Sequence, residues 1–259
     1  MEVDFAAVMA RVRRVIDDGI AFYEREIERD EGITLFRGHA RFADEHALEC
    51  EGETVEFEHA LVATGARPRI PDLPGLDRVP FATSDDLLEA TELPGRLVCL
   101  GAGAVSLEFA QAYRRFGAEV TIVLRGERIA RGEDAELAGL LQRYLEEEGV
   151  RIVTGARIER AELDGGRPSL VLAGAPRVTG DLLLVATGRE PAADGLGLAE
   201  LGIGTGPAGV AVDDELRTAL PHVFAGGSSS CSTPARERSS APTCWRSMGA
   251  TSCPARWWR

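Results

Sequence analysis

The stretch that most constrains the fold runs from Arg96 to Leu124, where two short apolar runs enclose a glycine-rich turn. Residues 96–100 have the length and composition of a buried strand. The sequence Gly-x-Gly-x-x-Ser follows at once, residues 107–116 have helical spacing, and residues 119–124 form a second strand-like run. This order predicts a strand–turn–helix–strand unit, so we expect an α/β fold of the Rossmann-like type.

The residues of the turn suit the binding of a dinucleotide. Gly101 permits the tight turn, and Gly103 lets backbone N–H groups approach a pyrophosphate at the helix N-terminus, beside Ala104. Ser106 is small enough for close packing of helix on strand. The alternative is an ordinary glycine-rich turn. Residues 204–209 have the same glycine spacing, but they lack a strand before and a helix after, and we expect a loop there.

The end of the second strand indicates which dinucleotide is bound. NAD-specific enzymes place an acid there for the ribose 2′-hydroxyl, but this strand ends at Arg125, and Arg128 and Arg131 follow. Arginines suit a 2′-phosphate through charge-assisted, bidentate hydrogen bonds. NADP(H) is therefore favoured and NAD remains possible. The alternative is three solvated surface arginines, and an inward-pointing Glu127 would argue against NADP(H).

The rest of the chain to residue 227 also alternates between helical and extended patterns. Apolar spacing predicts helices over 5–28 and 134–148. Strands are predicted over 150–153 and 181–187, and a small antiparallel meander over 156–178. Shorter strands are expected within 33–57, over 58–65, over 210–212 and over 222–225, with an extended loop over 67–75.

The composition changes abruptly after Gly227. Residues 228–259 contain no Val, Ile, Leu or Phe, hold all three Trp, and carry five Arg against one Glu. A segment without aliphatic residues cannot offset the entropy cost of ordering its own backbone. A basic interaction tail and a solvated disordered tail are two interpretations. We favour a third, GC-rich DNA translated out of frame, because the whole chain lacks Lys and Asn, which have A-rich codons.

The remaining composition limits the partners and the compartment. The formal net charge is −13, of which the tail contributes +4 and the rest −17, so neither nucleic acid nor an anionic membrane is expected as a partner. No apolar run reaches the roughly 18 residues that span a bilayer. The five Cys show neither zinc-site nor disulfide-scaffold spacing, so we expect a cytoplasmic protein.

In combination, these motifs resemble the pyridine nucleotide–disulfide oxidoreductases, flavoproteins such as dihydrolipoamide dehydrogenase, mercuric reductase and glutathione reductase. The resemblance covers residues 1–227. It rests on the fingerprint from Gly101 and on two related sequences, Ala63-Thr64-Gly65 and Ala186-Thr187-Gly188-Arg189. It implies that Ala63, Thr64 and Gly65 touch an FAD domain. It also implies that Gly188 borders the nucleotide site, that Glu108 lies near the flavin–nicotinamide junction, and that Arg125 and Arg131 match NADPH-type members.

The departures from this family are equally informative. The family begins with its own glycine-rich FAD fingerprint and a redox-active Cys-x4-Cys, and neither occurs in this sequence. Ser228 stands where the family has the Asp that holds the ribityl chain of the flavin, and the C-terminal dimerisation domain with its His-Glu pair is missing. None of the four His has a triad-like setting, and no catalytic or metal-binding residue is assigned.

We therefore expect a truncated fragment of such a reductase, inactive alone and of doubtful FAD retention. An NADP(H)-binding Rossmann-like domain, 94–212, would be inserted in a partial, discontinuous FAD-binding domain, 1–93 and 213–227, before the anomalous segment 228–259. The main alternative is a non-catalytic NADP(H)-binding module or the partner of a separately encoded FAD half. An ordinary single-domain dehydrogenase is weakened because a Tyr-x-x-x-Lys pair is impossible without Lys.

Overall fold

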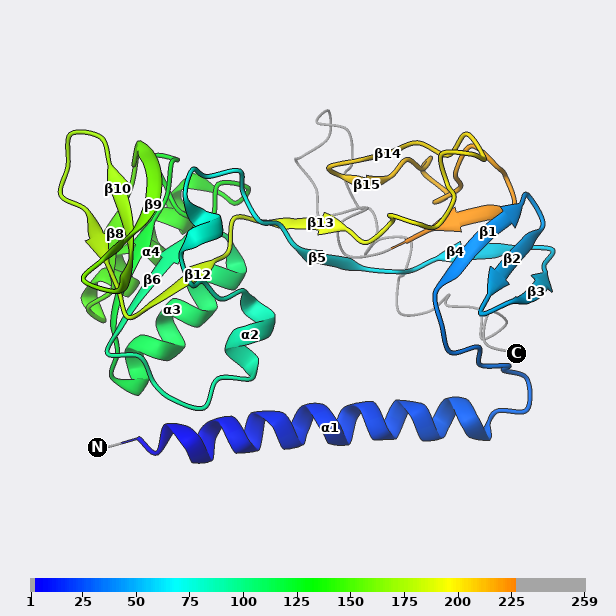
Figure 1. The fold of residues 1–259 in the computed structure, drawn as a ribbon, viewed down its shortest axis with the longest axis horizontal. Helices are drawn as coiled ribbons and strands as arrows, with labels where there is room; N and C mark the ends of the chain where they lie inside the picture. The colour runs from blue at the N-terminus through cyan, green and yellow to red at the C-terminus, as the bar shows by residue number, and fades with distance from the viewer. Residues whose placement is uncertain (1–2, 227–259) are drawn as a thin grey trace. The chain divides into compact units, whose positions relative to one another are not determined.

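The computed structural model describes residues 3–226, which form two compact units (Figure 1). The first unit comprises residues 3–21 and 68–189, and the second comprises 22–67 and 190–226. The chain therefore passes between units at 21/22, 67/68 and 189/190, whereas the sequence placed the boundaries at 93/94 and 212/213. The reason is packing, since Leu73 joins the core of the first unit, and Leu198 and Ile203 join that of the second.

The first unit is built on a parallel sheet with the strand order β12-β6-β7-β8. Helix α3 (Ala104–Phe116) connects β6 (Arg96–Leu100) to β7 (Glu119–Val123), and α4 (Ala135–Glu147) connects β7 to β8 (Arg151–Val153). Strand β12 (Leu182–Val185) pairs with the other edge of β6. The predicted strand–turn–helix–strand unit and the Rossmann-like fold are thus confirmed.

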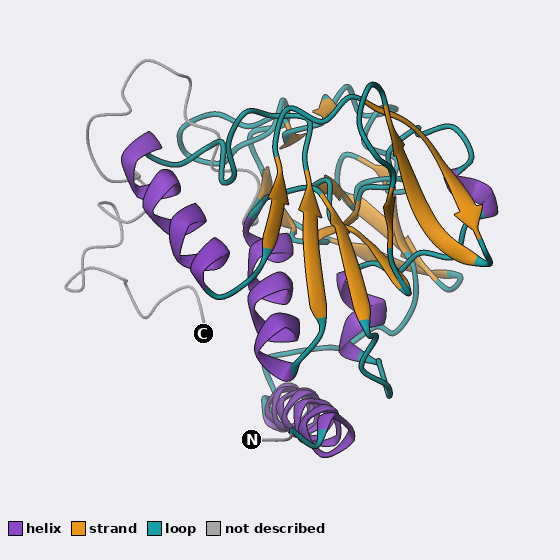
Figure 2. Ribbon diagram, turned by 90° about the vertical axis from the view of Figure 1, so that its left-hand side faces the viewer, coloured by secondary structure: helices purple, strands orange, loops and turns teal. Residues whose placement is uncertain are grey.

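Helices lie on one face of this sheet and an antiparallel sheet lies on the other (Figure 2). From β6, Leu97 and Cys99 pack with α3, while Val98 and Leu100 pack with an antiparallel sheet on the opposite face. That second sheet is the predicted meander, with β10 (Arg167–Leu172) between β9 (Ile158–Asp164) and β11 (Val178–Thr179). Strands with both faces buried explain why the sequence shows continuous apolar runs there.

Three short or terminal elements complete the first unit. They are the 3₁₀ turn η1 (Leu76–Arg78), helix α2 (Ser84–Leu88) and the start of α1 (Phe5–Arg29). The ring of Phe5 lies 5.6 Å from those of Tyr113 and Phe116, both edge-on. This contact anchors the beginning of α1 on α3.

The second unit contains an antiparallel meander and several two-stranded sheets. Its strands are β1 (Ala40–Asp44), β2 (Ala47–Cys50), β3 (Glu53–Glu56), β4 (Ala60–Val62), β14 (Thr205–Gly206), β15 (Gly209–Val210) and β16 (Val223–Ala225). Strands β5 (Ala66–Pro68) and β13 (Arg189–Pro191) pair with each other. The predicted loop at 204–209 is a tight hairpin with no helix after it, which agrees with its exclusion as a fingerprint.

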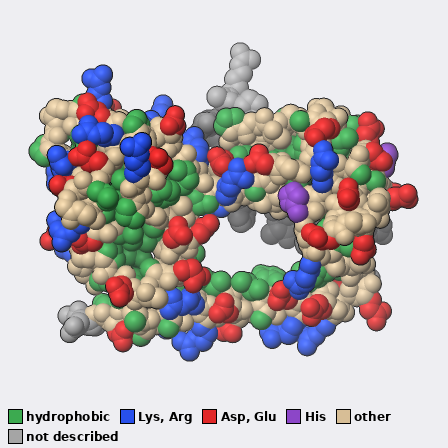
Figure 3. Space-filling model, in the orientation of Figure 1, with side chains coloured by type: hydrophobic (Ala, Val, Ile, Leu, Met, Phe, Trp, Pro, Cys, Tyr) green, Lys and Arg blue, Asp and Glu red, His purple; other side chains and the backbone are tan. Residues whose placement is uncertain are grey.

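Helix α1 has an apolar stripe that is buried only at its start. The stripe repeats at spacings of three and four, and it comprises Phe5, Met9, Val12, Ile16, Ile20, Tyr23 and Ile27. Met9 is 4% exposed, but Ile20 is 55% and Tyr23 68% exposed. Acidic and arginine side chains are intermingled with apolar ones along this helix (Figure 3). Across residues 3–226, no helix is long and apolar enough to cross a membrane.

Candidate nucleotide-binding site

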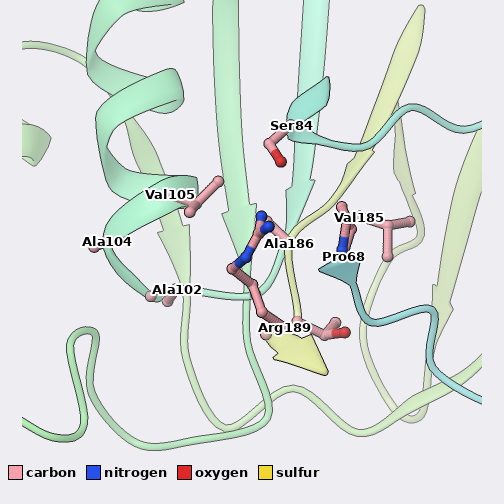
Figure 4. A pocket seen from close by; sticks show the side chains of 12 residues that line it. Pro68, Ser84, Ala102, Ala104, Val105, Val185, Ala186 and Arg189 are labelled. Atoms are coloured by element: carbon pink, nitrogen blue, oxygen red, sulfur yellow. The ribbon is translucent and has the colours of Figure 1, made fainter. Parts of the chain in front are cut away.

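A cavity of about 230 Å³ lies in the first unit, at the carboxyl ends of β6 and β12 (Figure 4). The chain leaves β6 toward β7 on one side, while β12 pairs on the other, so this is the point where the strand order reverses. Ligands of open α/β sheets bind at such a point. The lining residues are Pro68, Ser84, Gly101, Ala102, Gly103, Ala104, Val105, Val185, Ala186, Thr187, Gly188 and Arg189.

Gly101 is held in a conformation that other residues rarely adopt. Its φ is +113°, and a Cβ atom there would lie 2.3 Å from the carbonyl oxygen of Ala186. Its N–H donates to the carbonyl of Val123 at 2.9 Å. The ends of β6, β7 and β12 therefore lie close together at Gly101, and only glycine fits at this position.

Ser106 fixes the same turn from the other side. Its side chain is fully buried, and its hydroxyl donates to the carbonyl oxygen of Gly101 at 2.7 Å. The sequence indicated only that a small residue was needed here. The structure adds that the hydroxyl ties the first turn of α3 to the glycine-rich turn.

The N-terminus of α3 is open toward the cavity. Gly103 is the N-cap and has no side chain to cap the helix, and nothing lies within 4 Å of where its Cβ would be. Within residues 3–226, the N–H groups of 104–106 find no acceptor. Free amides at a helix N-terminus form an anion site, so this turn fits the pyrophosphate of a dinucleotide.

The opposite wall is formed by residues 185–189. Arg69 and Thr187 hold it in place: the Arg69 guanidinium donates to the Thr187 carbonyl at 3.0 Å, and the Thr187 hydroxyl donates to the Arg69 carbonyl at 3.0 Å. Arg189 extends from the start of β13 into the cavity (Figure 4). Sequence reasoning did not assign Arg189 to the site, although it directly follows Gly188 in a quoted motif.

The loop between β7 and α4 carries three arginines. Arg125 and Arg131 are exposed and Arg128 is partly buried, and none of the three has an ion pair within the described chain. The carboxylate of Glu127 lies beside Gly155, about 3.1 Å from where a Cβ on that glycine would be. It is therefore not paired with these arginines.

This loop is also hydrogen-bonded to the glycine-rich turn. Ala130 donates its N–H to the carbonyl of Ala102 at 2.9 Å and has a φ of +45°. Ile129 is fully buried in the core next to it. The fingerprint and the arginine loop are therefore adjacent, although neither Arg125 nor Arg131 lines the cavity.

The structure does not bring every predicted site residue to this cavity. Glu108 is exposed on α3 and does not line it. Ala63, Thr64 and Gly65 belong to the second unit, between β4 and β5. Thr64 lines two cavities of that unit, one of them the apolar pocket with Phe42 and Leu48.

Both cysteines of residues 3–226 are shielded from solvent. Cys50 and Cys99 are free and buried, and burial raises the pKa of Cys99 to about 12. Burial also raises the pKa of Tyr113 to about 12, with a smaller contribution from Cys99. No group of three His, Cys, Asp or Glu that could hold a metal occurs in this part of the chain.

Comparison with known proteins agrees with this geometry. The sequence model of the family described as "pyridine nucleotide-disulphide oxidoreductase" matches residues 10–247. The mercuric reductase of Streptomyces lividans is 35% identical over 88% of this chain and 50% of the relative. The dihydrolipoyl dehydrogenase of Bacillus subtilis is 31% identical over 88% of this chain and 50% of the relative.

A solved structure shows the same fold. The flavoprotein disulfide reductase RclA from Escherichia coli superposes with a TM-score of 0.82 at 28% identity, over 90% of this chain and 54% of that one. The chain thus spans about half the length of these proteins. Members of the family are FAD- and NAD(P)-dependent oxidoreductases. The family match over most of the sequence shows that this chain belongs to the pyridine nucleotide–disulphide oxidoreductases.

Proposed function

We propose that the first unit binds NADP(H), with the pyrophosphate on the N-terminus of α3 and the 2′-phosphate on Arg125 and Arg131. Three arginines within seven residues, none paired with a carboxylate in the described chain, carry this proposal. The bound nucleotide supplies a hydride, and the protein holds and orients it.

Binding of the two dinucleotides to the purified chain tests this assignment. We expect NADPH to bind more tightly than NADH, and Arg125→Glu to abolish or reverse the preference, because a like charge then faces the 2′-phosphate. Arg143→Glu, an equal charge change on the exposed side of α4, should preserve the preference. Equal affinity of the wild-type protein for both dinucleotides would overturn the assignment.

For the whole protein we propose an FAD-dependent reductase that passes electrons from NADPH through FAD to a disulfide or a metal substrate, of which this chain is an inactive fragment. Its sequence has one fingerprint, at Gly101, and no Cys-x4-Cys. Glu108 and the segment Ala63-Thr64-Gly65 then belong to the flavin side of the complete enzyme. The chain should purify colourless and should not bind added FAD. A yellow protein with a flavin absorption band would contradict the fragment interpretation.

Two surfaces favour a second candidate, a module that joins a separately encoded FAD half. Strands β4 and β16 form a two-stranded parallel sheet, whereas parallel sheets are ordinarily larger and covered on both faces. Leu61 on β4 is 67% exposed, and Ile16, Ile20 and Tyr23 of the α1 stripe are exposed. Co-expression with the FAD-fingerprint segment of a family member, as a separate chain, tests this candidate. Co-purification of a yellow complex would support it, and separate elution would count against it.

Two further proposals concern the chain's end and its location. The segment 228–259 lies outside the described residues, and the family match reaches residue 247 within it. We attribute its composition to translation out of frame, and resequencing of the gene across the codon for Gly227 tests this. Since Cys50 and Cys99 are free thiols, we place the protein in the reducing cytoplasm.

A further inference from the structure

Arg128 differs from its two neighbours in how its side chain is held. It is partly buried, and its Nη2 donates to the backbone carbonyl of Arg131 at 3.0 Å. Its Nη1 has no solvent-accessible surface and no hydrogen-bond partner in the described chain. The guanidinium therefore folds back over its own loop, with Nη2 bonded to the Arg131 carbonyl.

Such a side chain is costly to maintain. A buried N–H without a partner loses its hydration without compensation, and no carboxylate of the described chain neutralises the charge. A strained or unsatisfied group that persists beside a ligand site suggests a role in that site. The hydrogen bond to the Arg131 carbonyl shows which part of the loop the Arg128 side chain restrains.

The loop around Arg128 is fixed at several neighbouring points. Ile129 is fully buried, and Ala130 donates to Ala102 of the glycine-rich turn. Glu133 donates its N–H to the carbonyl of Ala130 at 2.9 Å, and Asp134 caps α4 through the N–H groups of residues 136 and 137. Between these anchors, the contact from Arg128 is the side-chain bond that restrains the Arg131 backbone.

We infer that Arg128 is a positioning residue for recognition of the 2′-phosphate. It holds the backbone of Arg131 so that the Arg131 guanidinium is presented beside the glycine-rich turn. This inference rests on the proposed NADP(H) function. It assigns to Arg128 no contact with the nucleotide, so its effect must pass through Arg131.

The test is a double-mutant cycle on the full chain, with the Kd of NADPH and of NADH measured for each protein. Arg128→Met keeps most of the side-chain volume but removes the hydrogen bond and the charge. We expect it to weaken NADPH binding about tenfold and NADH binding by less than about twofold. In an Arg131→Ala background, Arg128→Met should change NADPH binding by less than about twofold, because the residue through which it acts is gone.

Folding and specificity controls accompany the cycle. Since Arg128→Met removes an unpaired buried N–H, the variant should unfold at a urea concentration no lower than the wild type. If Arg128→Met does not fold, Arg128→Gln, whose side chain is shorter and uncharged, takes its place in the same cycle. Arg143→Met on α4 should leave both affinities unchanged.

The outcomes separate this inference from the proposed function. A wild-type protein that binds NADPH and NADH equally overturns both. A wild-type preference for NADPH that survives Arg128→Met overturns the inference alone. If Arg128→Met weakens the binding of both dinucleotides equally, the inference is also overturned. The same holds if Arg128→Met still weakens NADPH binding fully in the Arg131→Ala background. Either result shows that Arg128 does not act through Arg131.

Discussion

Replacement of Gly101 by alanine tests how the glycine-rich turn is built. A Cβ atom at this position would lie 2.3 Å from the Ala186 carbonyl oxygen, and real Cβ contacts are essentially never closer than 3.0 Å. The backbone of β12 or of the turn must therefore move. The φ of +113° adds a conformational cost of roughly 1–2 kcal/mol for a residue with a side chain. Together with an overpacking cost of roughly 1–3 kcal/mol, we expect Gly101→Ala to destabilise the protein by about 2–5 kcal/mol.

Two other glycines provide matched controls for the same chemical change. Gly139 lies inside α4 with nothing within 4 Å of its Cβ position, so Gly139→Ala should raise the free energy of unfolding by about 0.5–1 kcal/mol. Gly103 has a φ of −82° and open space around it. Gly103→Ala should therefore change stability little, yet weaken NADPH binding, because the methyl group enters the space reserved for the pyrophosphate.

Urea unfolding followed by circular dichroism gives the stabilities, and titration with NADPH gives the affinities. We expect Gly101→Ala to lose both stability and affinity, Gly103→Ala mainly affinity, and Gly139→Ala neither. The reasoning would be refuted if Gly101→Ala were as stable as Gly139→Ala. It would also be refuted if Gly103→Ala bound NADPH as tightly as the wild type.

Two further predictions concern the buried polar groups beside the turn. Ser106→Ala removes the 2.7 Å bond to the Gly101 carbonyl and should lower the free energy of unfolding by about 1–3 kcal/mol in urea titrations, and an unchanged midpoint would contradict this. The raised pKa values of Cys99 and Tyr113 mean that both groups keep their protons to higher pH in the folded state than in the unfolded state. The unfolded chain then releases protons first, so stability should fall as the pH rises from the ordinary Cys value of 9.0 toward about 12. Cys99→Ala should flatten that decline, and a slope identical to that of the wild type would show that Cys99 does not cause it.

The elements around the fingerprint could be predicted because their signals are local. The run 96–100, the glycines that follow and the helical spacing of 107–116 each lie in a few consecutive residues, and all three appear where expected. Helix α3 begins at Ala104, earlier than its apolar spacing indicated, because Gly103 serves as its N-cap. Local pattern therefore identified the unit but not its first turn.

The unit boundaries depend on contacts between distant residues. Residues 68–93 lack a strong periodicity, yet Ala82 exchanges backbone bonds with the β12 region through Leu183 and Val185. Residues 190–212 follow a predicted strand directly, but their apolar side chains pack in the second unit. Residue spacing does not show which of two cores a segment joins. The sequence therefore placed the boundaries at 93/94 and 212/213, whereas the chain passes between the units at 21/22, 67/68 and 189/190.

The hydrogen bonds within the arginine loop could not be predicted from the sequence either. The sequence pointed to Arg125 and Arg131 through their place after the strand, and those positions are exposed as expected. It could not show that Arg128 bonds to the carbonyl of Arg131, or that Ala130 adopts a positive φ to reach Ala102. Both hydrogen bonds end on backbone carbonyls of loops, and residue type alone carries little information about such bonds.

We propose that this chain holds a dinucleotide between the N-terminus of α3 and the arginine loop. Titration of isotope-labelled protein with NADP⁺, followed by amide chemical shifts, measures this most directly. We expect the largest shifts at residues 103–106 and 125–131, with little change in the meander of β1, β2 and β3. Saturable shifts centred outside the first unit, or the absence of shifts at 103–106, would contradict it.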